Sequence, residues 1–320
     1  MKLTTEITIE PMKHRVVYGD GMLFMGSCFA VEIGNICKGL GFHAMVNPFG
    51  VLYNPLSIAH ALHRLQSGTP FSSEEVIRVG EEYYCTFSHN TNFWNPTEEG
   101  LLKHVNKELE KASLCFKKAQ WVVVSLGTSW VFRFQPTMQV VANCHKMPSK
   151  LFERFCLSLP QTIQSLSEVL EAHPDKEFIF TVSPLRHLKD GLHGNQLSKA
   201  TLLLAVEQLC NNYQNAHYFP AYEIVLDELR DYRFYKEDMV HPTDQAVHYI
   251  FDRFVQFAID SSEEPALKAV QELKQMLLHK PLFPESEAFK KFEALKEKKT
   301  DELKRNYPMV NMEYLVCNGC

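Results

Sequence analysis

The chain has 320 residues, of which 45% are hydrophobic and 22% are charged, and its formal net charge is −5 at pH 7. This length and apolar content are sufficient to bury a substantial core. The Lys and Arg residues are scattered and form no basic stripe, so we expect no nucleic-acid partner.

The first residues lack the basic segment, apolar core and small-residue cleavage site of a secretory signal. The longest apolar runs, at 121–124 and 178–182, are too short to cross a bilayer. The nine cysteines are an odd number without a disulfide framework, which favours reduced thiols. We therefore expect a soluble, cytoplasmic protein without a membrane partner, in which the terminal Cys317-Asn318-Gly319-Cys320 is a frayed tail.

Short apolar runs alternate with amphipathic stretches of helical length, and this alternation predicts an α/β fold with a mainly parallel sheet. Near-continuous apolarity indicates strands that are buried on both faces. Strands are expected at 22–25, 43–46, 121–125, 177–183 and 217–219. Helices are expected at 29–40, 55–66, 97–118, 148–172 (interrupted at Pro160), 196–213 and 242–259.

The remaining segments indicate additions to this sheet. Residues 69–95, rich in aromatic and polar groups, are interpreted as an insertion, and 130–142 as a hairpin with its turn at 135–137. Helical patterns at 265–278 and 285–304 become densely charged. We therefore divide the chain into an α/β domain at 1–261 and a helical C-terminal extension at 262–320.

Reactive or polar side chains follow the expected strands, at the sheet edge where open α/β sheets bind ligands. Alone, each has an ordinary explanation, since Ser after Gly often caps a helix and Asp-x-x-His before Pro can form a turn. Together they occur in the order that one reaction needs, with Ser27 first and Asp238 and His241 last. The other candidates are Gly50, Gly127, Thr128, Ser129, Arg186 and His187.

The string Gly26-Ser27-Cys28-Phe29-Ala30 resembles the signature of the GSCFA domain family, which is similar to a branch of the SGNH/GDSL hydrolase superfamily. Five further strings, at 47–55, 125–128, 141–146, 183–190 and 231–242, also resemble that family. The resemblance implies a three-layer α/β/α fold and acyl-ester chemistry, with Ser27 as nucleophile, His241 as base and Asp238 as its partner.

Two positions depart from the superfamily pattern. Gly26 stands where relatives with the GDS motif carry Asp, and Gly127-Thr128-Ser129 stands where others carry Gly-x-Asn with an amide in the oxyanion hole. A serine hydroxyl can still donate one hydrogen bond, and the backbone N–H groups of Ser27 and Gly50 are further candidate donors. The departures permit slow or specialised catalysis and do not exclude it.

Other residues offer alternatives at the same site. Cys28 is a second candidate nucleophile, because the N-terminus of the following helix would stabilise a thiolate, although we expect it to pack under that helix. Asn143, His145, Arg186 and His187 are expected to line the substrate crevice. Cysteine and histidine at Cys144-His145 and at 187–193 lack the spacing of a metal site, so no metal or cofactor is expected.

The resulting hypothesis is a serine esterase that removes an acetyl or other short acyl group from a carbohydrate-like or small-molecule ester. His89 is a further candidate base or substrate contact, with packing in the insertion as the ordinary alternative. O-acyl transfer by the same triad and an inactive ligand-binding or scaffold protein are the competing functions. The sequence leaves the oligomeric state open.

Overall fold

A parallel five-stranded sheet forms the centre of the computed structural model, which describes residues 5–316. Its strand order is β10-β9-β5-β1-β2, and every neighbouring pair is parallel. The strands are β1 (Gly21–Gly26), β2 (His43–Val46), β5 (Ala119–Leu126), β9 (Glu177–Val182) and β10 (Ala216–Tyr218). All five expected strands are therefore confirmed, as is the α/β fold class.

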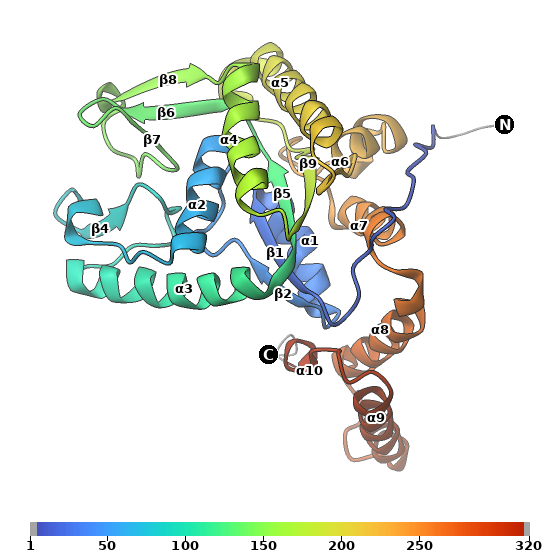
Figure 1. The fold of residues 1–320 in the computed structure, drawn as a ribbon. Coiled ribbons are helices and arrows are strands. Elements are labelled where there is room, and N and C mark those ends of the chain that lie inside the picture. The colour runs from blue at the N-terminus through green and yellow to red at the C-terminus, as the bar shows by residue number, and fades with distance from the viewer. Residues whose placement is uncertain (1–4, 317–320) are drawn as a thin grey trace.

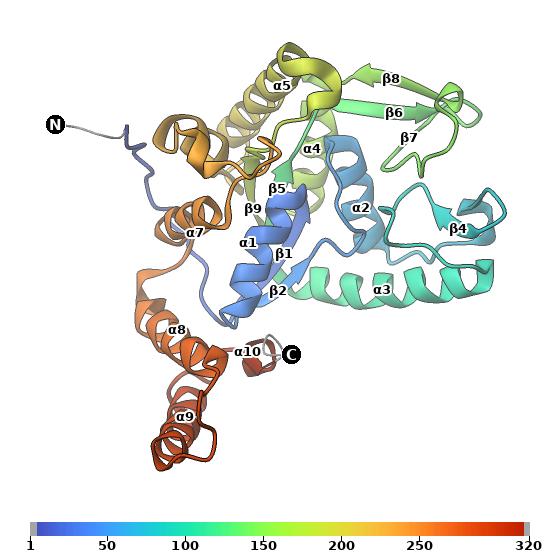
Figure 2. The same cartoon turned by 180° about the vertical axis from the view of Figure 1, so that it is seen from behind.

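Helices cover both faces of the sheet (Figures 1 and 2). Successive side chains of a strand point to opposite faces, so Phe24 of β1 belongs to one apolar cluster and Met25 to the other. The first cluster includes α1 (Cys28–Gly39) and α7 (Asp244–Ala258). The second includes α2 (Pro55–Ser67), α3 (Glu98–Lys118), α4 (Leu159–Ala172) and α5 (Gly191–Asn212). This arrangement is the expected α/β/α sandwich.

Two small antiparallel sheets lie outside the central one. The segment 69–95 contributes the pair β3 (Val76–Val79) and β4 (Tyr83–Thr86). The expected hairpin at 130–142 is present as β6 (Trp130–Phe134) and β7 (Gln139–Val141). Because β6 follows β5 directly, the hairpin lies next to the carboxyl end of the central sheet (Figure 1).

The expectation of one interrupted helix at 148–172 is wrong in its first part. Residues Phe152–Cys156 form β8, which pairs antiparallel with β6. Helix α4 begins only after Ser158, whose side chain forms a capping box with Gln161. Pro160 therefore lies in the first turn of the helix, where proline is tolerated, and does not interrupt it.

Further short elements complete the described chain. A single α-helical turn, α6 (Ala221–Glu223), runs into a π-helical turn at Ile224–Glu228. Turns of 3-10 helix occupy Ser73–Glu75, Ser149–Leu151, Leu188–Asp190, Tyr232–Phe234 and Ser261–Glu263. Within residues 5–316, no helix is both long and apolar enough to cross a membrane.

The C-terminal region is helical, as expected, and consists of α8 (Glu264–Leu278), α9 (Glu287–Asn306) and α10 (Met312–Val316). It meets the domain at the amino end of β2, where Asn311 N–H donates to Gly41 O at 2.7 Å. Lys299 of the charged run pairs with Glu272 at 2.6 Å and so ties α9 to α8. These helices thus lie at the end of the sheet opposite the carboxyl ends of its strands (Figure 1). The terminal Cys317-Asn318-Gly319-Cys320 lies outside the described residues.

The turn from β1 into α1 depends on a glycine. Gly26 has φ = +127°, and a Cβ atom there would lie 2.1 Å from Ser125 O of β5. The Asn47 side chain, which follows β2, binds both backbone groups of Gly26: its Oδ1 accepts from Gly26 N–H at 2.7 Å and its Nδ2 donates to Gly26 O at 3.1 Å. The first residues of α1 are therefore fixed against both neighbouring strands.

We expect Gly26→Ala to lower the free energy of unfolding by more than about 4 kcal/mol, because the added methyl group meets backbone that cannot move aside. Gly80→Ala is the matched control, since Gly80 also has positive φ (+61°) but a Cβ atom there would have no neighbouring atom within 4 Å. The control substitution should lower the free energy of unfolding by about 1 kcal/mol. Denaturant unfolding measures both, and equal losses would contradict the assigned clash.

Candidate functional site

Asp238 and His241 form a hydrogen-bonded pair. His241 Nδ1–H donates to Asp238 Oδ2 at 2.6 Å, while Asp238 Oδ1 accepts the backbone N–H groups of Val240 and His241, each at 2.9 Å. These bonds, with the imidazole contributing further, lower the pKa of Asp238 to about 2. The carboxylate is thus ionised at neutral pH and orients the imidazole so that Nε2 faces outward.

The pair stands beside a cleft at the carboxyl end of the sheet. The cleft has a volume of about 390 Å³ and is lined by Tyr53 and Asn54, the β6 and β8 strands, the loop after β9, and Val240. His241 is close enough to His187 for its charge to contribute to the lowered pKa of His187, although burial is the main cause. The His241 side chain is 44% exposed, so its free edge is accessible.

Ser27 is buried beside this cleft. Ser27 is 1% exposed, and its hydroxyl forms a 2.8 Å hydrogen bond with the Ser125 hydroxyl. The same oxygen accepts from Phe29 N–H at 3.2 Å and so caps α1. Among the described residues, no hydrogen bond joins Ser27 to His241.

Cys28, the first residue of α1, is more exposed than Ser27 and reaches a residue of the cleft. Its Sγ lies 3.7 Å from the Tyr53 hydroxyl. The Tyr53 ring in turn packs edge-on against His187, with ring centroids 5.3 Å apart. Burial, followed by the neighbouring Cys28, raises the pKa of Tyr53, so its hydroxyl remains a proton donor.

The backbone N–H groups expected to act as oxyanion donors are already engaged. Ser27 N–H donates to Ser125 O at 2.9 Å, and Gly50 N–H donates to Asn47 O at 2.7 Å. An amide that already has an acceptor in the protein is a poor donor to a developing charge. The expectation that these two groups line the oxyanion hole therefore does not fit this conformation.

The third expected group of donors, Gly127 to Ser129 after β5, forms hydrogen bonds with other parts of the chain. Gly127 and Thr128 both donate their N–H groups to Tyr53 O, at 2.8 and 3.0 Å. Ser129 donates its N–H to Ser198 Oγ at 2.8 Å, and the two hydroxyls lie 3.1 Å apart. Ser129 is fully buried and therefore does not supply the side-chain donor suggested by the sequence.

Two N–H donors around the cleft have no acceptor among the described residues, and neither was identified from the sequence. The Cys28 N–H has no acceptor in the described chain, as is usual in the first turn of a helix. Asn54 is 5% exposed and lines the cleft; its Oδ1 accepts Ser57 N–H at 2.9 Å, which leaves Nδ2 without a partner among residues 5–316. The Asn54-Pro55 pair was the sequence signal that could have identified Asn54. Asn followed by Pro is typical of a helix N-cap, in which the side-chain amide is held in place.

The four residues expected in the crevice separate into two groups. Arg186 and His187 line the cleft. His145 is buried and donates or accepts through Nε2 to Thr86 O at 2.8 Å, while Asn143 Oδ1 accepts His145 N–H at 2.7 Å. Asn143 and His145 thus fix the loop after β7 to the insertion and do not line the cleft.

His89 has a packing role. It is 2% exposed, lies 2.7 Å from Thr86 Oγ1 through Nδ1, and stacks on Phe49 with centroids 5.0 Å apart. Burial lowers its pKa to about 3, so it stays neutral. Across the described ranges, no group of three or more His, Cys, Asp or Glu side chains is placed to hold a metal ion.

Comparison with protein families agrees with this architecture. Residues 21–254 match the GSCFA family, and residues 270–314 match the C-terminal domain of GSCFA domain proteins. The chain belongs to the GSCFA family. No curated protein matches it significantly.

A buried lysine braces the cleft of this GSCFA protein. Lys199 of α5 is 1% exposed, and its Nζ donates to Gly127 O at 2.6 Å and to Ser183 O at 2.7 Å. These carbonyls follow β5 and β9, so one side chain ties together the loops after two neighbouring strands. Burial, with Arg186 adding a like charge, lowers the pKa of Lys199 to about 7.

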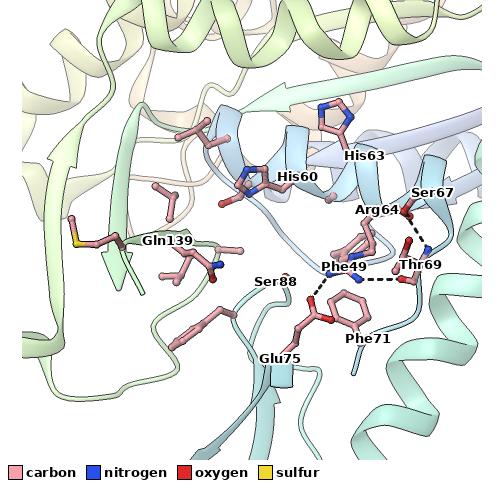
Figure 3. A pocket seen from close by; sticks show the side chains of 18 residues that line it. Phe49, His60, His63, Arg64, Ser67, Thr69, Phe71, Glu75, Ser88 and Gln139 are labelled. Atoms are coloured by element: carbon pink, nitrogen blue, oxygen red, sulfur yellow. Dashed lines mark hydrogen bonds and ion pairs between the residues drawn. The ribbon is translucent and has the colours of Figure 1, made fainter. Parts of the chain in front are cut away.

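A larger groove of about 820 Å³ adjoins the cleft, and Val141 and Ala142 line both. It lies between α2, the insertion and β7 (Figure 3). Arg64 holds one wall in place by donating to Thr69 O, by pairing with Glu75, and by stacking over the Phe71 ring at 4.3 Å. Aromatic rings and polar groups such as His60 and Gln139 share its surface.

We expect the free energy of unfolding of the wild-type protein to rise between about pH 7 and about pH 8.5 relative to that of Lys199→Met. The unfolded chain keeps this lysine protonated up to about pH 10.4, whereas the folded protein releases the proton near 7, so raising the pH favours folding. The difference should approach about 1.4 kcal/mol per pH unit. Denaturant titrations at several pH values measure it, and parallel curves for the two proteins would contradict a neutral buried lysine.

Proposed function

We propose that this GSCFA protein is an ester hydrolase that works through an acyl-enzyme at the cleft. The observation that carries the proposal is the Asp238–His241 pair, in which an ionised carboxylate fixes the tautomer of an accessible imidazole. The resemblance of the sequence to SGNH/GDSL hydrolases supports the same chemistry. The nucleophile comes from the β1–α1 turn, which offers the Ser27 hydroxyl and the Cys28 thiol.

In the proposed reaction, His241 Nε2 accepts the proton of the nucleophile as it attacks the ester carbonyl. Asp238 stabilises the resulting imidazolium, which then donates its proton to the departing alcohol. The unengaged Cys28 N–H and Asn54 Nδ2 are the donors available to the tetrahedral oxyanion. Water, activated by the same imidazole, releases the acid and restores the nucleophile.

The proposed ester joins a short acyl group to a larger, carbohydrate-like alcohol. The cleft of about 390 Å³ has room for the acyl group and part of the alcohol, while the adjoining groove of about 820 Å³ offers rings and polar groups to a carbohydrate-like portion. Arg186 lines the cleft and has no ion-pair partner among residues 5–316. Its charge favours esters that also carry an anionic group.

Acyl transfer is the second candidate. The His241 imidazole is 44% exposed and is open to an alcohol as well as to water, so it serves either reaction. Product analysis with an added polyol distinguishes the two reactions, because transfer produces a new ester and hydrolysis produces free acid.

We expect His241→Ala to reduce kcat/KM for short-chain nitrophenyl esters by about 10²–10⁴-fold, because the base and its proton transfer are lost. Asp238→Asn should also impair turnover, since the ionised partner of the imidazole is removed. His248→Ala is the control, because His248 is exposed nearby on α7 and bonds only to Asp244 O within its own helix. A folded wild-type protein that binds esters without turnover would contradict the proposal and favour a ligand-binding function.

A further inference from the structure

The two candidate nucleophiles of the β1–α1 turn differ in what they contact. Ser27 Oγ is buried, bonded to Ser125 Oγ at 2.8 Å, and used as the cap of α1. An attack through this oxygen would require the loss of the cap and a rotation of the side chain out of the protein interior. A helix cap of this kind contributes about 1 kcal/mol to stability.

Cys28 caps no helix and is less buried than Ser27, although it packs, as expected, against the apolar cluster that includes α1 and α7. It is partly exposed and is the first residue of α1, next to the N–H groups of the first helical turn. Its sulfur lies 3.7 Å from the Tyr53 hydroxyl, which lines the cleft and can donate a hydrogen bond to a thiolate.

A second observation concerns the cleft that Tyr53 lines. Asn54 is a buried residue, 5% exposed, that lines the same cleft, and its Nδ2 has no partner among the described residues. Its Oδ1 is fixed by Ser57 N–H, so the amide cannot turn its NH₂ group elsewhere without losing that bond. Asn54 Nδ2 is therefore a fixed donor that is available to an oxygen of a ligand in the cleft.

We propose that Cys28 Sγ is the atom that attacks the ester, and that Ser27 is a positioning residue that holds α1 in place. This inference rests on the proposed function. The thiol gives its proton to His241 Nε2, and the sulfur forms a bond to the acyl carbon. The C–O bond of the ester then breaks, and the alcohol leaves with the proton from His241. Water attacks the thioester, His241 takes its proton and returns it to sulfur, and the products are a carboxylic acid and the free thiol.

The test is an acid quench during turnover of nitrophenyl acetate, followed by intact-mass analysis of the full chain. We expect one acetyl group per chain that neutral hydroxylamine removes, as it removes thioesters but not ordinary oxygen esters. Ser27→Ala should retain this adduct, and Cys28→Ala should lose it. Cys28→Ser provides the conservative variant and should form a hydroxylamine-stable ester if it reacts. Cys210→Ala is the matched control, because Cys210 is a partly buried thiol on α5.

Two other outcomes would overturn the inference in distinguishable ways. An adduct that resists hydroxylamine and disappears in Ser27→Ala would assign the attack to Ser27 and leave the proposed function intact. The absence of both adduct and hydrolysis in the folded wild-type protein would remove the proposed function together with this inference. Circular dichroism and thermal unfolding of each variant show whether a lost adduct reflects a lost fold.

Discussion

The contact between Gly26 and the backbone of Ser125 determines where α1 begins, and the site depends on that starting point. A side chain at position 26 would collide with β5, so the turn lies closer to the neighbouring strand than any other residue would allow. The Asn47 side chain also binds the N–H and C=O groups of Gly26. In this geometry Ser27 faces Ser125 in the interior, while Cys28 faces Tyr53 at the cleft.

Buried hydrogen bonds hold the loops around the cleft together. Tyr53 O accepts two N–H groups from the loop after β5, and Lys199 Nζ binds a carbonyl from each of the loops after β5 and β9. Burial disfavours the charged ammonium even though two carbonyls accept from it, and this is the main reason why the pKa of Lys199 is lowered. Other backbone hydrogen bonds engage the N–H groups of Ser27 and Gly50, which the sequence suggested as oxyanion donors. The donors that remain are at the start of α1 and at Asn54.

The sequence predicts the central sheet well because its strands are buried on both faces and are therefore almost continuously apolar. It does not predict β8. Glu153 and Arg154 interrupt the apolar pattern of this strand, and α4 begins so soon after it that the two segments read as one helix. The Asp238–His241 pair is predictable because both residues lie in one loop. The burial of Ser27 is not, since it depends on Ser125, which is remote in sequence. The burial of Lys199 is likewise not predictable from the sequence, because a lysine on an amphipathic helix usually faces solvent.

A crystal structure of the protein after reaction with a small halomethyl ketone tests most directly which side chain is the nucleophile. A thiol displaces the halide and bonds to the methylene carbon, which leaves the ketone one carbon away from sulfur, within reach of donors around the nucleophile. We expect a bond to Cys28 Sγ, a ketone oxygen within hydrogen-bond distance of Cys28 N–H or Asn54 Nδ2, and the His241 imidazole beside the modified sulfur. An adduct elsewhere on the chain, or a ketone oxygen turned away from both donors, would contradict this expectation.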